Sequence, residues 1–166
     1  MYKKGTKVCY PFYGVGKIES ITTKVFNGQE QRYYSISFFD ENLKVMVPVD
    51  KAKELGLRDV LSKKEVKALL EVLKDRASEP NIKDIDRSYF LHMIGSVDIS
   101  DVVRGVCDLL CKKEIDGLKR NESDLLKRGI NILIGLIVCD GKINSTEARK
   151  MIMDYWEEGL GKKKKS

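Results

Sequence analysis

The chain is poor in the residues from which most active sites are built. It has one histidine, His92, and four cysteines, none of them in a Cys-x-x-Cys pair. It also lacks a Gly-x-Ser-x-Gly motif, a phosphate-binding P-loop and a Gly-x-Gly-x-x-Gly motif. Few side chains are therefore available for a nucleophile, a metal site or a phosphate site. We predict a protein that is not an enzyme and uses no cofactor or metal.

Long apolar runs are missing as well. The longest nearly apolar stretch, residues 130–139, has ten residues, and an α-helix needs roughly 20 to cross a bilayer. No apolar segment of a secretory signal follows Met1. Cysteines without a disulfide framework are typical of a reducing compartment. We therefore expect a cytoplasmic protein with reduced thiols and no membrane contact.

Positive charge is in excess but unevenly distributed. The net charge is +6, and residues 1–60 hold ten Lys and Arg against seven Asp and Glu. Residues 61–161 are nearly neutral, with 17 basic and 18 acidic residues, and the run 162–165 adds four lysines. The excess fits either a polyanionic partner or ordinary solubility charge. The lysine run itself can bind phosphates or form a disordered, solubilising end.

The first sixty residues have the pattern of a small all-β unit. Glycines and a proline interrupt short β-branched and aromatic runs, which predict strands at 7–9, 16–23, 31–38 and 44–48. Asn27-Gly28 is a hairpin signal because both residues tolerate positive φ. We predict a small SH3/Tudor-like β barrel over residues 1–60.

From residue 61 the hydrophobic period changes from 2 to 3.6, which indicates helices. Capping motifs at Ser62–Glu65 and Asn144–Glu147 place two helix starts, and Asn121 is the predicted N-cap of a third helix. The predicted helices are 62–75, 84–94, 100–113, 122–139 and 144–158, with the fourth central because its second half is apolar almost all round. The fold class is thus α+β, with a five-helix domain over 61–160 and a disordered lysine tail over 161–166.

The segment 4–16, KGTKVCYPFYGVG, resembles the opening of the CarD family of bacterial transcription regulators, in which a run of the type GDxVVYPxxGVG begins the RNA-polymerase-interacting module. Residues 45–52 and 55–60 match the strand and turn that close the family's barrel. Further on, 98–104 and 125–138 are similar to its third helix and its long buried helix. The similarity covers nearly the whole chain.

The resemblance implies a nucleoid-associated protein that binds the β subunit of RNA polymerase, contacts promoter DNA and modulates the stability of the open complex. We expect a monomer, although the sequence itself leaves the oligomeric state open. An edge strand suits such docking because its unpaired backbone groups can accept a strand from a partner. The positions that would face the polymerase are Lys24, Phe26, Lys44 and Met46, and Met46 stands where family members commonly carry Arg.

The helical part departs from the family pattern. An ungapped match puts Lys83 where members present a Trp that wedges at the upstream edge of the DNA bubble, and the chain's one tryptophan, Trp156, lies far from it. Apolar wedges and basic phosphate contacts are the physical basis of such DNA engagement. The candidates for DNA contact are Lys83, Arg87, Lys112 and Arg128, and Tyr89 or Phe90 would be substitute wedges. The alternative function is a basic DNA-binding protein that acts without polymerase contact.

Two further patterns allow a second interpretation. The dense aromatics of residues 10–39 could form a cage for a methylated lysine or arginine, but in a barrel of this size we interpret them as core and hairpin pairs. Cys107 and Cys111 lie one helical turn apart without a second ligand pair, so we interpret them as packing residues. His92 has no assignable partner for general base catalysis.

Overall fold

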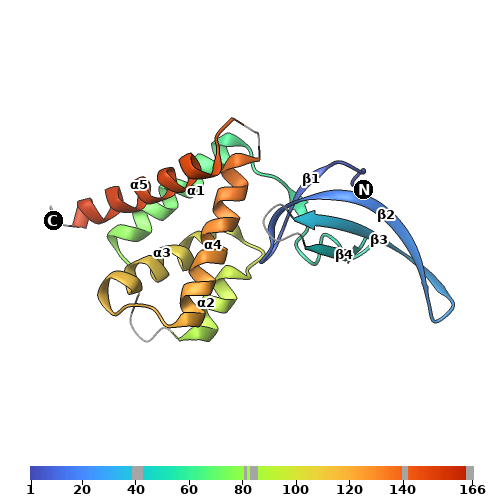
Figure 1. Cartoon of the computed structure of the whole chain (residues 1–166), viewed down its shortest axis with the longest axis horizontal. Coiled ribbons are helices and arrows are strands. Elements are labelled where there is room, and N and C mark those ends of the chain that lie inside the picture. The colour runs from blue at the N-terminus through green and yellow to red at the C-terminus, as the bar shows by residue number, and fades with distance from the viewer. Residues whose placement is uncertain (39–42, 81, 83–85, 140–141, 164–166) are drawn as a thin grey trace.

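The computed structural model describes residues 1–166 except 39–42, 81, 83–85, 140–141 and 164–166. It confirms the α+β class: a five-stranded antiparallel sheet is followed by five helices. Figure 1 shows the sheet at one end of the molecule and the helices at the other, with the β2–β3 hairpin extending away from the helices. No helix in the described part of the chain has the length and apolar character that a membrane span requires.

The sheet has the strand order β4-β3-β2-β1-β5 and curls around its own small core. Its strands are β1 (Lys7–Tyr10), β2 (Gly14–Phe26), β3 (Gln29–Phe38), β4 (Lys44–Pro48) and β5 (Arg58–Asp59). The predicted turn at Asn27-Gly28 joins β2 to β3, and both residues have positive φ. The alternating apolar side chains of β3 fill the barrel, with Tyr34 and Ile36 buried. The aromatics Tyr34 and Phe38 therefore belong to the core, as expected.

The helical domain is built around one long helix. The helices are α1 (Lys63–Ser78), α2 (Arg87–Ile94), α3 (Ile99–Ile115), α4 (Arg120–Val138) and α5 (Ser145–Lys163). Helix α4 contacts each of the other helices and also β2. This confirms the central position that its apolar sequence predicts, since a helix that is apolar on most sides must be covered on most sides.

Several helix ends differ from the prediction. Helix α1 continues to Ser78, beyond the predicted end at 75, because Ala77 is fully buried. Helix α4 begins at Arg120, one residue before the predicted N-cap Asn121. The Glu122 carboxylate accepts a hydrogen bond from the backbone N–H of Lys119. Helix α2 begins at Arg87, and α5 continues through Lys163 into the segment predicted as a disordered tail. The predicted end of α4 at 140–141 lies outside the described residues.

Candidate functional site

Strand β4 forms one edge of the sheet, and its backbone is arranged to accept another strand. The N–H of Phe38 donates to the carbonyl of Leu43, and the N–H of Val49 donates to that of Arg32. Hydrogen-bonded pairs alternate along an antiparallel ladder, so the intervening β4 residues Lys44 and Met46 direct their N–H and C=O groups away from β3. Pro48 follows at the same outward-facing parity, where a missing N–H costs no ladder bond.

The side chains beside this edge are basic and exposed. Lys44 and Met46 both point outward from the barrel core, with Met46 38% exposed. Lys17 of β2 lies in the same cross-strand row as Lys44, through Ser37 of β3. Lys24 is exposed further along β2, opposite Gln31, and Phe26 is the last residue of that strand. The structure therefore places Lys44 and Met46 on the open edge strand, and Lys24 on the same outer face but further out on the β2–β3 hairpin, beyond the end of β4.

The motif that opens the barrel also joins the barrel to the helices. Cys9 and Val15 are buried in the helical core cluster rather than in the core of the barrel. Gly14 has a φ of +77°, and a Cβ there would lie 3.3 Å from the Cα of Ile132 on α4. Only glycine combines this backbone conformation with so close an approach. The glycine of the family-like run thus has a packing reason in this fold.

Arg128 adds a contact between the helices and the opening motif of the barrel. Its guanidinium lies 4.2 Å from the ring centroid of Phe12 and donates a 3.3 Å hydrogen bond to the Phe12 carbonyl. Phe12 itself has a φ of 67°, an uncommon value for a residue other than glycine, which surrounding contacts must maintain. On the other side of the joint, the Lys7 ammonium donates to the carbonyl of Cys139 at the end of α4. Arg128, a candidate for DNA contact, therefore holds the two domains together.

The other DNA candidates fall in three different environments. Arg87 is exposed in the first turn of α2. Lys112 is half-buried: its ammonium lies 2.6 Å from a carboxylate oxygen of the buried Glu122 and 5.6 Å from the ring centroid of Phe90. Lys83 lies outside the described residues. Of Arg87, Lys112 and Arg128, Arg87 is the one that is fully on the surface.

Tyr89 and Phe90, the two aromatic residues that could replace the Trp wedge, are packed inside the helical domain. Phe90 is completely buried, and the half-buried Tyr89 donates a 2.8 Å hydrogen bond from its hydroxyl to Asp108. Asp108 is 0% exposed and also receives two 3.0 Å hydrogen bonds from the guanidinium of Arg76. This Arg76–Asp108–Tyr89 cluster links α1, α3 and α2. Neither aromatic can enter a DNA bubble without leaving this packing.

The same cluster predicts a loss of stability at high pH. Burial and the hydrogen bond to Asp108 raise the pKa of Tyr89 from its ordinary value of 10.0 to about 12. Below pH 10 both the folded and the unfolded chain keep this proton. Between pH 10 and 12 the unfolded chain releases it first, so this contribution to stability is lost as the pH rises. Urea unfolding of the wild type and Tyr89→Phe at pH 9 to 12 measures it.

The free energy of unfolding should fall more steeply between pH 10 and 12 in the wild type than in Tyr89→Phe. The difference between the two slopes is the contribution of Tyr89. Burial also raises the pKa values of Tyr2 and Tyr10, and both variants share these groups. Parallel pH profiles for the two proteins would contradict the role assigned to Tyr89.

Metal and thiol chemistry find little support in the described part of the chain. No group of three potential metal ligands is present among these residues. Cys107 and Cys111 are buried in the helical core. The hydrogen bond to Cys111 and burial raise the pKa of the Cys107 thiol, which disfavours the reactive thiolate. His92 is exposed in the last turn of α2.

Sequence reasoning missed the residues that hold the helical domain together. The prediction assigned no role to Asp108, although a single acid within the apolar run 106–111 is a signal for a buried, paired carboxylate. It also gave Glu122 no role, yet Glu122 is buried and paired with Lys112. Burial raises the pKa of Glu122, but the ammonium of Lys112 and the N–H of Lys119 outweigh that effect and hold it below its usual range.

Comparison with known proteins agrees with the sequence resemblance. Residues 2–61 match the CarD-like/TRCF RID domain family. A solved structure, CdnLNt from Myxoccoccus xanthus, is 32% identical over 38% of this chain and 89% of that chain, with a TM-score of 0.33. The matched region contains the whole barrel, including the edge strand β4 and the joint motif. The chain belongs to the CarD-like family.

Proposed function

We propose that this protein is a transcription regulator that binds the β subunit of RNA polymerase through strand β4 and modulates the stability of the promoter open complex. A CarD-like RID domain implies interaction with RNA polymerase and a role in transcription regulation. The observation that carries the finer proposal is the outward-facing backbone of Lys44 and Met46 at the edge of that same domain. An edge of this kind binds a partner by adding a strand.

The exposed lysines on the outer face of the sheet support the same surface. Lys24 and Lys44 would complement acidic groups next to the partner strand and fix the direction of docking. Met46 replaces the Arg that family members commonly carry, so this part of the contact would be apolar here. The function needs no catalytic group, and the protein would act as a monomer in the cytoplasm, at the nucleoid.

The helical domain would have a reduced role at DNA. It lacks the family's Trp, and its substitutes Tyr89 and Phe90 are packed inside. Lys112 and Arg128 make internal contacts, which leaves the exposed Arg87 as the best-placed phosphate contact among the described candidates. We therefore propose that polymerase binding, rather than insertion into the bubble, provides most of the affinity for the open complex.

Met46→Pro removes the outward N–H of the edge strand and should weaken binding of the full chain to a β-subunit fragment by at least about tenfold. Met46→Arg keeps that N–H and supplies the family's residue, so it should bind at least as well as the wild type. Lys24→Glu should also weaken binding, whereas Lys150→Glu, exposed on α5, should not. Surface plasmon resonance measures all four, with thermal melting as the folding control.

The lifetime of the open complex on a promoter then tests the function itself. The wild type should change this lifetime, and Met46→Pro should lose the change in proportion to its loss of polymerase binding. Equal binding by Met46→Pro and Met46→Arg would exclude strand addition at β4. An unchanged lifetime despite tight binding would exclude the regulatory role at this step.

A further inference from the structure

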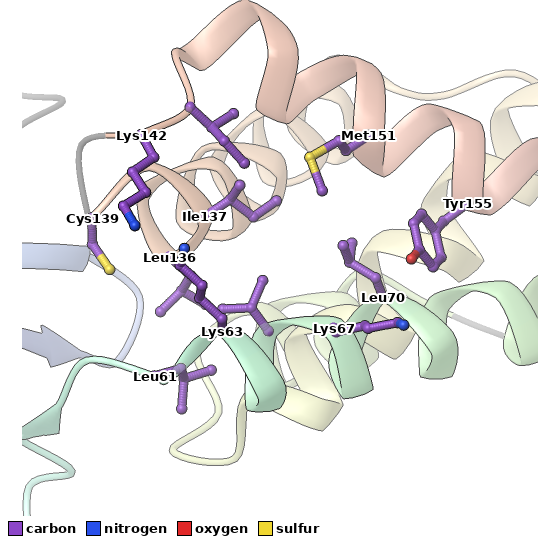
Figure 2. A pocket seen from close by; sticks show the side chains of 12 residues that line it. Leu61, Lys63, Lys67, Leu70, Leu136, Ile137, Cys139, Lys142, Met151 and Tyr155 are labelled. Carbon is purple, nitrogen blue, oxygen red and sulfur yellow. The ribbon is translucent and has the colours of Figure 1, made fainter.

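The helical domain leaves a pocket of about 260 Å³ open between α1, the end of α4 and the first half of α5, as Figure 2 shows. Lys63 and Lys142 at its border already interact with other groups of the chain, so their charges give little preference for one class of ligand. A strand edge in the barrel is more specific. Its backbone N–H and C=O groups determine the direction and the register of any strand that pairs with them.

This free edge belongs to strand β2, on the side that faces away from β3 and β4. Strand β1 pairs with β2 as far as Lys17, and the last backbone hydrogen bonds on this side join Ile18 to Gly5 and Thr6. The strand continues to Phe26, and in the described part of the chain no backbone hydrogen bond meets this side of it beyond Ile18. Figure 1 shows the β2–β3 hairpin extending beyond the rest of the sheet. The end of β2 is thus free to pair with another strand.

The ladder with β3 shows which backbone groups of β2 point outward. The N–H of Val49 donates to the carbonyl of Arg32, so the backbone groups of Arg32 point toward β4. Thr23 is the β2 partner of Arg32, and it therefore directs its own N–H and C=O away from β3. Ile21 and Val25, two residues to either side of Thr23, have the same orientation because the register is unbroken there. These three residues form the free edge, and all three are exposed.

The side chains of this edge favour strand pairing. Ile21 is 36% exposed and Val25 is 65% exposed, although both are large and apolar. Thr22 and Thr23 lie between them, and β-branched residues of this kind are typical of paired strands. Lys24 is the single charged residue in the segment 20–25. An exposed strand edge with little charge is a template for pairing with another chain.

We propose that the free protein forms a reversible dimer in which the β2 edges of two copies pair antiparallel about a two-fold axis at Thr23. In this register Ile21 of each copy lies opposite Val25 of the other, and Thr23 lies opposite its own equivalent. All of these residues direct their backbone groups outward, so each pair exchanges two backbone hydrogen bonds. The same patch serves both copies, as a two-fold dimer requires.

The side chains select this register. An axis at Thr23 places apolar Ile21 beside apolar Val25 across the dimer, and such cross-strand pairs stabilise a sheet. It also places Lys24 opposite Thr22, whereas an axis at Lys24 would put two lysines directly opposite each other at a cost in stability. An acidic strand of another protein would be attracted by Lys24 alone. The self-complementary pattern therefore favours a second copy of this chain over an acidic partner.

The dimer is weak and separate from the polymerase edge. Pairing of one short strand from each copy is smaller than a standard interface, so we expect a dissociation constant on the order of 100 µM. Strand β4 lies on the other side of the sheet. The dimer is a form of the free protein, and it does not depend on the function proposed above, in which the chain acts as a monomer through β4.

Sedimentation equilibrium of the full chain tests the proposal at concentrations from about tenfold below to about tenfold above this dissociation constant. Thr23→Pro removes an N–H that points away from β3, so the hairpin keeps its own ladder while dimerisation should weaken at least about tenfold. Glu30→Pro is the matched control. Glu30 pairs with Val25 and directs its N–H away from β2, on the other edge of the hairpin, so dimerisation should stay within about twofold. Thermal melting checks the folding of each variant.

Charge variants test the register. Thr22→Glu places a carboxylate opposite Lys24 of the other copy and should tighten the dimer by about fivefold, whereas Thr22→Lys should weaken it by a similar factor. A chain that stays monomeric throughout the concentration range, equal losses in Thr23→Pro and Glu30→Pro, or similar effects of Thr22→Glu and Thr22→Lys would each overturn the proposal. A synthetic peptide of alternating glutamate and valine tests the other occupant. Saturable binding of this peptide to a chain that stays monomeric, lost in Thr23→Pro, would assign the edge to an acidic partner instead.

Discussion

Asp108→Ala should lower the free energy of unfolding by about 3–5 kcal/mol, the cost of breaking a buried ion pair by removing one partner. The Asp108 carboxylate is completely buried and accepts hydrogen bonds of 3.0 Å from two nitrogens of the Arg76 guanidinium. Its loss leaves Arg76, whose side chain is 26% exposed, without its anion. It also leaves the Tyr89 hydroxyl without its acceptor. Urea unfolding at pH 7 measures the change.

Glu158→Ala is the matched control for this prediction. It removes the same charge from another ion pair to α1, since Glu158 lies 2.6 Å from Lys74, but its side chain is 59% exposed. Exposed pairs contribute about 0.2–1 kcal/mol. If Asp108→Ala is too unstable to study, Tyr89→Phe removes one bond to the carboxylate and should cost about 1.5 kcal/mol. Equal losses in Asp108→Ala and Glu158→Ala would show that burial of this cluster adds nothing.

The barrel should tolerate the loss of Asp108. Its core cluster, with Ile18, Tyr34 and Ile36, is separate from the cluster that contains the helices. Binding of the β-subunit fragment by Asp108→Ala should therefore stay close to that of the wild type wherever the chain is folded. A regulatory defect with intact binding would assign the helical domain its own part in open-complex stability.

The elements that local chemistry determines were predictable from the sequence. The capping box at Ser62–Glu65 and the reciprocal bonds of Asn144 and Glu147 occur where the motifs place them, because each needs only one turn of chain. The Asn27-Gly28 turn fixed the hairpin in the same way. The period of the apolar residues identified all five helices.

The contacts between distant elements were not predictable in this way. Arg128 lies 116 residues from Phe12 along the chain. Nothing in the local sequence shows whether Arg128 binds the barrel or a phosphate group. Lys112 is similar, since its ion pair depends on how α3 meets α4. A basic residue on a helix shows its charge in the sequence, but its partner depends on the tertiary packing. This is why the position of the edge strand was easier to predict than the contacts of Lys112 and Arg128.

The end of α5 shows how packing can override a local signal. Gly159 and Gly161 favour a helix end near residue 158, yet the helix continues to Lys163. Gly159 is buried where α5 crosses α1, and a Cβ built on it would lie 2.2 Å from the backbone carbonyl oxygen of Lys74. Figure 1 shows the two helices side by side. The glycine lets them approach, and the packing in turn stabilises the helix through it.

Gly159→Ala should therefore destabilise the protein by about 1–3 kcal/mol, although alanine is the better helix former. The added methyl group would also meet the Cβ of the buried Ala77 at 2.7 Å, so α1 and α5 must separate. Gly161→Ala makes the same change two residues later, where nothing lies within 4 Å of the new Cβ. It should stabilise by up to about 1 kcal/mol. Opposite signs in thermal melts of the two variants would establish close packing as the reason for Gly159, and stabilisation by both would exclude it.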